Sequence, residues 1–244
     1  MNEPTMRGPT PKTLAQLEAL VIERGRPLIV VDVDDCISIY IDHLDRYLAE
    51  LGFDLRLTSY QLEGSIFPKG TTDPLPFDDC IELLNRFFHV ECRRQALMPG
   101  AAEALQSMAS DAQIVILANA PHFAGDDRRA NLAELGIPGP VVTNTGGKGR
   151  ALAWLSAQAG APTAFIDDSV HQIESVARHA PHVLRLHFMG AESVQRLFPD
   201  CAEASAQVRN WQEAELVLRR ELPLPKATIS QAAPGKRTGS VRRS

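Results

Sequence analysis

The chain has 244 residues, of which 44% are apolar, and its formal net charge is −5 at pH 7. A chain of this length can bury a substantial core as one α/β domain, or as one domain with a small insert. The negative balance gives no general attraction to nucleic acid or to an anionic membrane surface, and no apolar run is long enough to span a bilayer. We therefore expect a soluble globular protein with no nucleic-acid or membrane partner.

The four cysteines stand far apart in the sequence and form no spacing typical of a zinc site. They are Cys36, Cys80, Cys92 and Cys201. This pattern favours free thiols in a reducing compartment, and the first residues contain no apolar leader segment. The sequence predicts a cytoplasmic location.

Short apolar runs alternate with longer segments of helical periodicity. Strands are predicted at 28–34, 113–118, 140–143, 163–167 and 183–188. Helices are predicted at 12–24, 101–110, 126–135, 149–159, 170–179 and 202–220. This alternation predicts an α/β fold with a Rossmann-like parallel sheet and helices on both faces. Ligands of such sheets bind beyond the carboxyl ends of the strands.

The segment between the first two predicted strands is too long for one crossover. It carries helical patterns at 41–53 and 77–90, separated by the loop-like stretch 66–76. We expect a small helical insert over residues 37–97. The predicted core is then formed by residues 12–36 and 98–221.

The two ends of the sequence have a different composition. Residues 1–11 are rich in Pro, Gly and Thr, and residues 222–244 combine Pro, Ser and Gly with basic side chains. Such segments cannot bury enough apolar surface to order themselves. We expect a flexible N-terminus and a disordered basic tail.

Carboxylates follow two of the predicted strands directly. Asp32, Asp34 and Asp35 come after the first strand, and the fourth strand delivers Asp167 and Asp168 to the same edge of the sheet. Burying several carboxylates together is costly unless a cation lies among them. Oxygen ligands favour a hard cation, and Mg²⁺ fits a site that also holds a substrate phosphate. Asp35 is better interpreted as a turn or capping residue.

A lysine and two acids give this edge a possible chemistry. Lys148, in the sequence GGKG before a predicted helix, can pair with the carboxylates and with a phosphate. A carboxylate below a metal-bound phosphate can attack phosphorus and form an aspartyl phosphate, which water then hydrolyses. A second acid can protonate the leaving alcohol. Asp32 and Asp34 could share these two roles.

Four motifs together resemble the haloacid dehalogenase superfamily. VVDVDDCI (30–37) resembles its first motif, an apolar strand followed by Asp-x-Asp-x-Thr/Val. IVILANA (114–120), Lys148 and FIDDSVHQIESV (165–176) resemble the second, third and fourth motifs, in the family's order. The resemblance covers residues 28 to about 190, and the insert stands where the family has a helical cap.

The resemblance implies a role for each matching residue. Asp32 would be the nucleophile and a Mg²⁺ ligand, and Asp34 would be the general acid/base and bind the ion through its backbone carbonyl. Lys148 would hold the phosphate and the nucleophile. Asp168 would be the carboxylate ligand from the fourth motif, with Asp167 as its partner.

The sequence departs from the family pattern at three positions. Ala118 stands where the second motif usually has Ser or Thr, so Asn119 and nearby backbone N–H groups would have to bind the phosphate. Losing one hydrogen bond to a charged group costs about 1.5–3 kcal/mol if nothing replaces it. Cys36 replaces Thr or Val in the first motif, and Gln172 replaces a supporting Asp or Asn in the fourth.

The resemblance implies a Mg²⁺-dependent phosphatase that acts on a small phosphorylated metabolite. Two alternatives stay open at this point. One is another phosphotransferase, such as a mutase, which also needs both acids. The other is a binding or regulatory protein with weakened turnover, which Ala118 and Gln172 favour.

Overall fold

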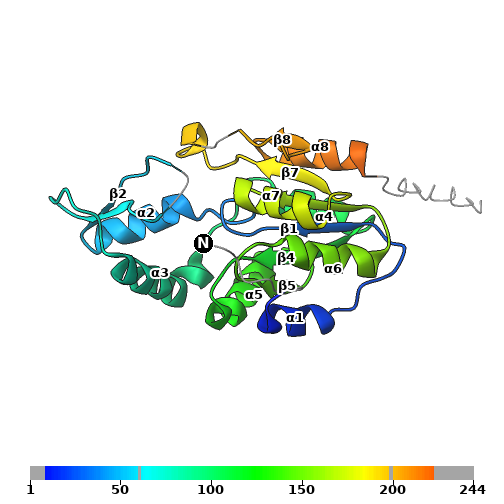
Figure 1. Ribbon diagram of the computed structural model, residues 1–244, viewed down its shortest axis with the longest axis horizontal. Helices are drawn as coiled ribbons and strands as arrows, with labels where there is room; N and C mark the ends of the chain where they lie inside the picture. Colours follow the sequence, from blue (N-terminus) through cyan, green and yellow to red (C-terminus); the bar gives the residue numbers. More distant parts are fainter. Residues whose placement is uncertain (1–8, 60–61, 198–199, 223–244) are drawn as a thin grey trace, which may run out of the picture.

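The computed structural model describes residues 9–59, 62–197 and 200–222. Its centre is a six-stranded parallel sheet with the strand order β5-β4-β1-β6-β7-β8 (Figure 1). The strands of this sheet are β1 (Leu28–Val31), β4 (Gln113–Ala118), β5 (Val141–Thr143), β6 (Thr163–Asp167), β7 (Leu184–Phe188) and β8 (Ala206–Val208). The predicted α/β fold with a parallel sheet is confirmed.

Helices cover both faces of this sheet. The α-helices are α1 (Pro11–Glu18), α2 (Ile41–Glu50), α3 (Phe77–Glu91), α4 (Ala101–Met108), α5 (Gly125–Glu134), α6 (Gly149–Ala159), α7 (Val170–His179) and α8 (Trp211–Glu221). Short 3-10 turns are η1 (Cys92–Arg94), η2 (His122–Ala124) and η3 (Gln195–Leu197). None of the helices that the structure describes is long and apolar enough to cross a membrane.

Strand β1 alternates its side chains between two cores. Ile29 and Val31 face the core that contains residues of α4 and α8, whereas Leu28 and Val30 face the core that contains residues of α1, α6 and α7. All four side chains are fully buried. A central parallel strand is covered on both faces, which explains why its sequence is continuously apolar.

Residues 37–97, called the insert below, lie between β1 and β4 in the chain. They contain α2, α3 and an antiparallel hairpin of β2 (Phe53–Leu55) and β3 (Ile66–Pro68). In Figure 1 these elements project together beyond one end of the sheet. The two predicted helices are confirmed, but the predicted loop is wrong at its start, because Ile66–Pro68 pairs with β2. The division of the chain into a core and a cap stays a prediction.

Three other expected elements differ from the structure. The predicted helix 202–220 is wrong in its first part, because Ala206–Val208 forms β8 beside β7. The helix begins only at Trp211, where the Asn210 side chain accepts a hydrogen bond from the backbone N–H of Glu213 at 2.8 Å.

The other two differences concern the entry to β1 and its exit. The predicted helix 12–24 ends at Glu18, and the chain then turns through Gly25, which has a φ of 85°, before it enters the sheet. Strand β1 ends at Val31 rather than 34, because the backbone turns at Asp35. Residues 1–8 and 223–244, which hold most of the expected flexible ends, lie outside the described residues.

Candidate active site

Two neighbouring strands bring the predicted acids together. Val31 of β1 is in register with Ile166 of β6, and the backbone N–H of Asp32 donates to the Ile166 oxygen at 2.9 Å. Asp32 and Asp167 therefore follow at the same level of the sheet edge. Asp168 comes one residue later, in the turn that leads into α7.

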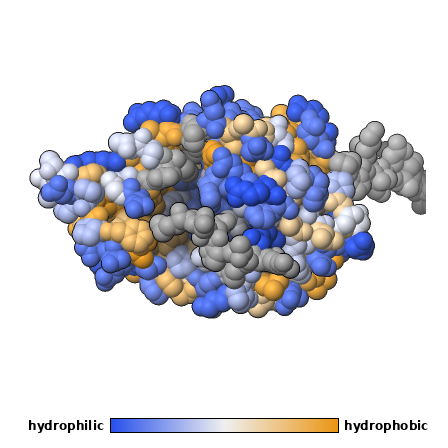
Figure 2. All heavy atoms as spheres, viewed as in Figure 1, coloured by the Kyte–Doolittle hydropathy of each residue, from blue (hydrophilic) through white to orange (hydrophobic). Residues whose placement is uncertain are grey.

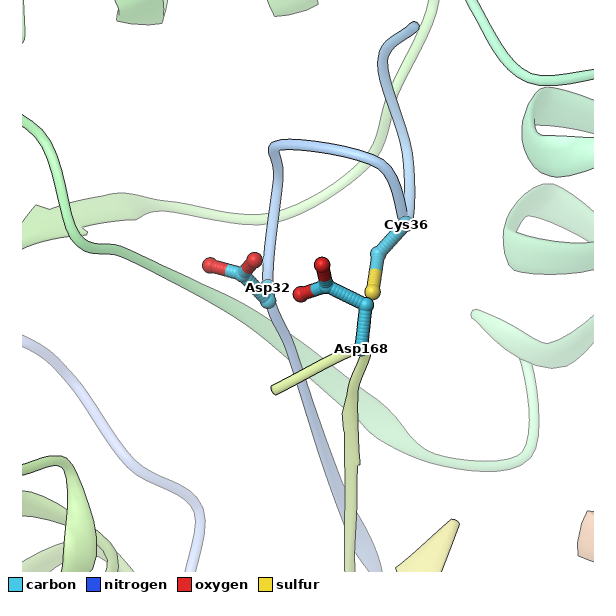
Figure 3. A group of neighbouring side chains, drawn as sticks. All are labelled: Asp32, Cys36 and Asp168. Carbon is cyan, nitrogen blue, oxygen red and sulfur yellow. The ribbon is translucent and has the colours of Figure 1, made fainter. Parts of the chain in front are cut away.

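Asp32, Cys36 and Asp168 form a group that could hold a metal ion. One ligand atom from each lies within 4.8 Å of the others, and all three residues are buried. Figure 3 shows the Asp168 carboxylate between Asp32 and the Cys36 sulfur. The two carboxylates fit Mg²⁺, which takes oxygen ligands. Cys36 is a soft donor that suits Mg²⁺ poorly, and burial raises the pKa of its thiol well above the ordinary value, so we assign it to packing.

Lys148 supplies a buried positive charge beside these acids. Its ammonium pairs with Asp32 Oδ1, and it also pairs with Asp167 Oδ2 at 2.6 Å. Burial alone would lower the pKa of Lys148. The carboxylates of Asp167 and Asp32 raise this pKa by more than burial lowers it, so it lies above the ordinary value. Lys148 therefore stays charged and balances part of the negative charge.

The backbone around Lys148 is fixed by α7. Gln172 Oε1 accepts a hydrogen bond from the Lys148 N–H at 2.7 Å, and its Nε2 donates to the Gly146 oxygen at 3.3 Å. The next residue, Gly149, lies so close to α7 that a Cβ would be 2.0 Å from the Ser175 oxygen. Gln172 thus supports the loop that carries the lysine, and only glycine fits behind it.

Asp34 has partners that the sequence analysis missed. Arg128 of α5 donates to Asp34 Oδ1 at 2.8 Å, and Gln95, just after η1, donates to the same oxygen at 3.2 Å. Burial raises the pKa of Asp34, and the opposing effect of Arg128 is smaller. No local sequence pattern pointed to Arg128 or Gln95, because each contacts Asp34 across a long stretch of the chain.

Asp35 holds the turn between β1 and α2. Its φ is 57°, a left-handed conformation that is uncommon outside glycine. Its Oδ1 accepts hydrogen bonds from the N–H groups of Tyr40 at 2.9 Å and Ile41 at 3.1 Å, at the start of α2. The expectation that Asp35 acts as a turn and capping residue fits this geometry. Burial raises its pKa to about 7.

Of the two residues in the second motif, Asn119 lines the pocket and Ala118 does not. Asn119 lines the pocket, donates to the Gly146 oxygen at 2.9 Å and accepts from the Asn144 side chain at 2.8 Å. Ala118 is buried at the end of β4, and its backbone oxygen accepts from the Asn144 N–H at 2.8 Å. Ala118 does not line the pocket, so its role in substrate binding stays a prediction.

The site opens into a pocket of about 290 Å³ where the sheet edge meets the insert. One side carries the acids, Lys148, Asn119, Ser169 and Gln172. The insert contributes Tyr40, Ile41, Leu57, Leu62 and Phe88. Figure 2 shows hydrophilic residues over most of the visible face, with apolar residues in patches, one of them over the region of α2 and α3.

Three cations of the insert could have faced this pocket, but each has another partner. Lys69 donates to the Ala49 oxygen at 2.8 Å. Arg94 pairs with Glu91 at 3.1 Å, and Arg93 pairs with Glu134. None of these three cations lines the pocket.

Comparison with known proteins adds a further finding. No protein-family model matches the sequence, and no curated protein matches it. Solved structures do match. A haloacid dehalogenase-like family hydrolase from Streptococcus pneumoniae is 14% identical, with a TM-score of 0.54, and the match covers 79% of this chain and 98% of that one.

Two further structures give the same result. The HAD-hydrolase YfnB from Bacillus subtilis, solved with bound magnesium, is 14% identical with a TM-score of 0.55, over 80% of this chain and 99% of that one. A protein from Thermotoga maritima described as a β-phosphoglucomutase is 14% identical with a TM-score of 0.51, over 80% and 100% of the two chains. The chain has the fold of the haloacid dehalogenase-like hydrolases.

Proposed function

We propose that this protein is a Mg²⁺-dependent phosphatase that hydrolyses a small phosphomonoester through an aspartyl-phosphate intermediate. The observation that carries the proposal is the buried pair of Asp32 and Lys148, which lies beside Asp168 at the floor of a pocket that Asp34 also lines. A nucleophile, a fixed cation and a second acid thus share one cavity. The fold, and its similarity to the magnesium-bound YfnB from Bacillus subtilis, support this proposal.

Each residue has a defined part in the proposed reaction. The Asp32 carboxylate attacks phosphorus, the bond to the leaving oxygen breaks, and Asp34 gives that oxygen a proton. Water then attacks the phosphorus of the Asp32 acyl phosphate and gives a proton to Asp34. The bond between phosphorus and the Asp32 oxygen breaks, which releases inorganic phosphate and frees the Asp32 carboxylate. Lys148 pairs with Asp32 and orients it, and its charge lies close to the transferred group.

Asp32 and Asp168, with the backbone oxygen of Asp34, would hold Mg²⁺. The bound ion would neutralise charge on the phosphoryl oxygens. Gln172 would act indirectly, through the backbone of Lys148.

The pocket also suggests the kind of leaving group. Among the described residues that line it, the insert contributes apolar and aromatic side chains and no cation. An anionic leaving group would find no partner there, whereas an apolar one would gain about 25 cal/mol per Å² of buried surface. We therefore propose an uncharged, partly apolar or aromatic alcohol as the leaving group.

Hydrolysis of p-nitrophenyl phosphate tests the activity. The parent should release phosphate with Mg²⁺ and not with EDTA, and Asp32→Asn should lower kcat by about a thousandfold or more. Asp126→Asn, at an exposed site on α5, is the matched control and should keep full activity. Activity that survives Asp32→Asn would refute the proposed nucleophile.

Two alternatives predict different products. A mutase would convert a sugar phosphate into its isomer instead of releasing phosphate. This alternative is compatible with the similarity to the Thermotoga maritima protein described as a β-phosphoglucomutase. A binding protein, favoured by Ala118 in place of Ser or Thr, would bind phosphate esters with Mg²⁺ but turn over none of a broad panel.

A further inference from the structure

Arg128 is a fully buried cation whose contacts lead to the active site. It lies on the inner face of α5, and its guanidinium is 2.8 Å from Asp34 Oδ1. Arg128 does not line the pocket. Its guanidinium also lies over the ring of Phe88, which lines the pocket, 5.9 Å from the ring centroid. Among the described residues, its ion pair with a pocket residue is the one to Asp34, so Asp34 is where it can affect proton transfer.

Only one oxygen of Asp34 is held by these contacts. Arg128 and Gln95 both donate to Oδ1, at 2.8 and 3.2 Å. Within the described residues, Oδ2 of Asp34 accepts no hydrogen bond, and the side chain is 18% exposed where it lines the pocket. The carboxylate thus has one fixed oxygen and one that is free to meet a ligand.

The ion pair of Arg128 and Asp34 would reduce the stability of the protein if its role were only structural. Nε and Nη1 of Arg128 are buried and have no hydrogen-bond partner in the part of the chain that the structure describes. Buried donors without partners reduce stability, and an apolar residue would fill the same place without that cost. A buried ion pair of this kind is better explained by what it does to Asp34.

Helix α5 also fixes the second donor. Asn131, three residues after Arg128, donates to the backbone oxygens of Arg93 at 3.0 Å and Gln95 at 3.2 Å. Residues three apart share one helix face. The same face therefore holds Arg128 directly against Asp34 and holds Gln95 in place beside it.

We propose that Arg128 is a positioning residue for proton transfer. With Gln95 it fixes Oδ1 of Asp34, so that Oδ2 faces the reacting groups. When the phosphorus–oxygen bond of the substrate breaks, its electron pair goes to the leaving oxygen, which takes the proton from Oδ2. Oδ2 later receives a proton from the attacking water. This inference rests on the proposed phosphatase function.

The leaving group provides the test. An alkoxide needs a proton to leave, whereas p-nitrophenolate needs almost none, so a misplaced Asp34 slows alkyl phosphates most. We expect Arg128→Met to lower kcat by about 100-fold or more on alkyl phosphates and by about tenfold or less on p-nitrophenyl phosphate. KM should change little, and Arg128→Lys should restore part of the lost rate. Arg129→Met, on the exposed face of the same helix, is the control and should change neither rate.

Asp34→Asn separates this inference from the proposed function. It should show the same dependence on the leaving group, and adding Arg128→Met to it should cause no further loss. If Asp34→Asn is selective and Arg128→Met slows all substrates equally, the positioning role is wrong and the phosphatase proposal stands. If the parent protein hydrolyses no phosphate ester, both the phosphatase proposal and the positioning role of Arg128 are wrong. Should Arg128→Met not fold, Gln95→Met must show the selective loss, and an unselective result there overturns the inference.

Discussion

Lys148 shows how the charges of single residues depend on one another in this site. Its ammonium is almost completely buried between Asp32 and Asp167. A buried ion pair adds little net stability compared with apolar residues, but removal of one partner leaves an uncompensated charge in a poorly solvated place. We therefore expect Lys148 to stabilise the site as well as to serve the proposed chemistry.

Replacement of Lys148 should be costly even without substrate. Lys148→Met should lower the free energy of unfolding by about 3–5 kcal/mol, because Asp32 and Asp167 lose their shared cation. Adding Asp167→Asn should recover part of this loss. Urea unfolding measures both effects. Lys12→Met, at an exposed position of α1, should change stability by about 0.5 kcal/mol or less, and an equally small effect of Lys148→Met would contradict the argument.

His187 gives the protein a pH-dependent stability. It is fully buried on β7, its Nε2 donates to the Asp168 backbone oxygen at 2.9 Å, and burial lowers its pKa from the ordinary value. Below a pH of about 6.5 the unfolded chain binds a proton that the folded chain excludes, so stability falls as the pH falls. His187→Gln should flatten this fall in unfolding measurements from pH 8 to 5. His171→Gln, at an exposed position of α7, should leave it unchanged.

The acids and the lysine were predictable from sequence, whereas their supporting residues were not. Asp32, Asp168 and Lys148 stand at strand and helix ends, and parallel topology alone brings such ends together. Arg128 and Gln95 reach Asp34 from 94 and 61 residues away in the chain. Such contacts depend on how α5 and the end of the insert pack, and no local pattern contains that information.

The ends of α8 and β8 show where local preference fails. The sequence around Ala206–Val208 is rich in Ala, Glu and Gln, which favour a helix, and it therefore predicts a helix from residue 202. In the structure this stretch pairs with β7, and pairing along a sheet edge overrides the weak local preference. The central strands were predictable because their continuous apolar runs leave little choice.

Trp211, the first residue of α8, ties this helix to the first motif. It is buried, its ring lies 5.5 Å from that of Phe188, and its Nε1 donates to the Cys36 backbone oxygen at 2.9 Å. Trp211→Phe removes this bond while keeping an aromatic ring, and should cost about 1–3 kcal/mol of unfolding free energy. Trp154→Phe, at a half-buried position of α6, is the control and should cost less. Equal effects of the two variants would show that the bond to Cys36 contributes nothing.

At the scale of the whole molecule, the pocket gathers more negative than positive charge. Asp32, Asp34, Asp35, Asp167 and Asp168 all line the pocket. Among the described residues, the buried cations that pair with these acids are Lys148 and Arg128. A divalent ion would offset part of the remaining negative charge. The folded protein should therefore bind Mg²⁺, whereas the unfolded chain, with its acids dispersed, should not.

Metal binding should be visible as a change in stability without any substrate. At a Mg²⁺ concentration of 100 times its Kd, binding adds about 2.7 kcal/mol to the free energy of unfolding. For a chain of this size, each kcal/mol raises Tm by about 2–4 °C, so the parent should melt several degrees higher with Mg²⁺, and EDTA should reverse the shift. Asp168→Asn should lose the shift, because it removes one of the two carboxylate ligands, while Asp126→Asn should keep it. A full shift in Asp168→Asn would mean that the ion binds elsewhere, and that Asp32 and Asp168 do not share it.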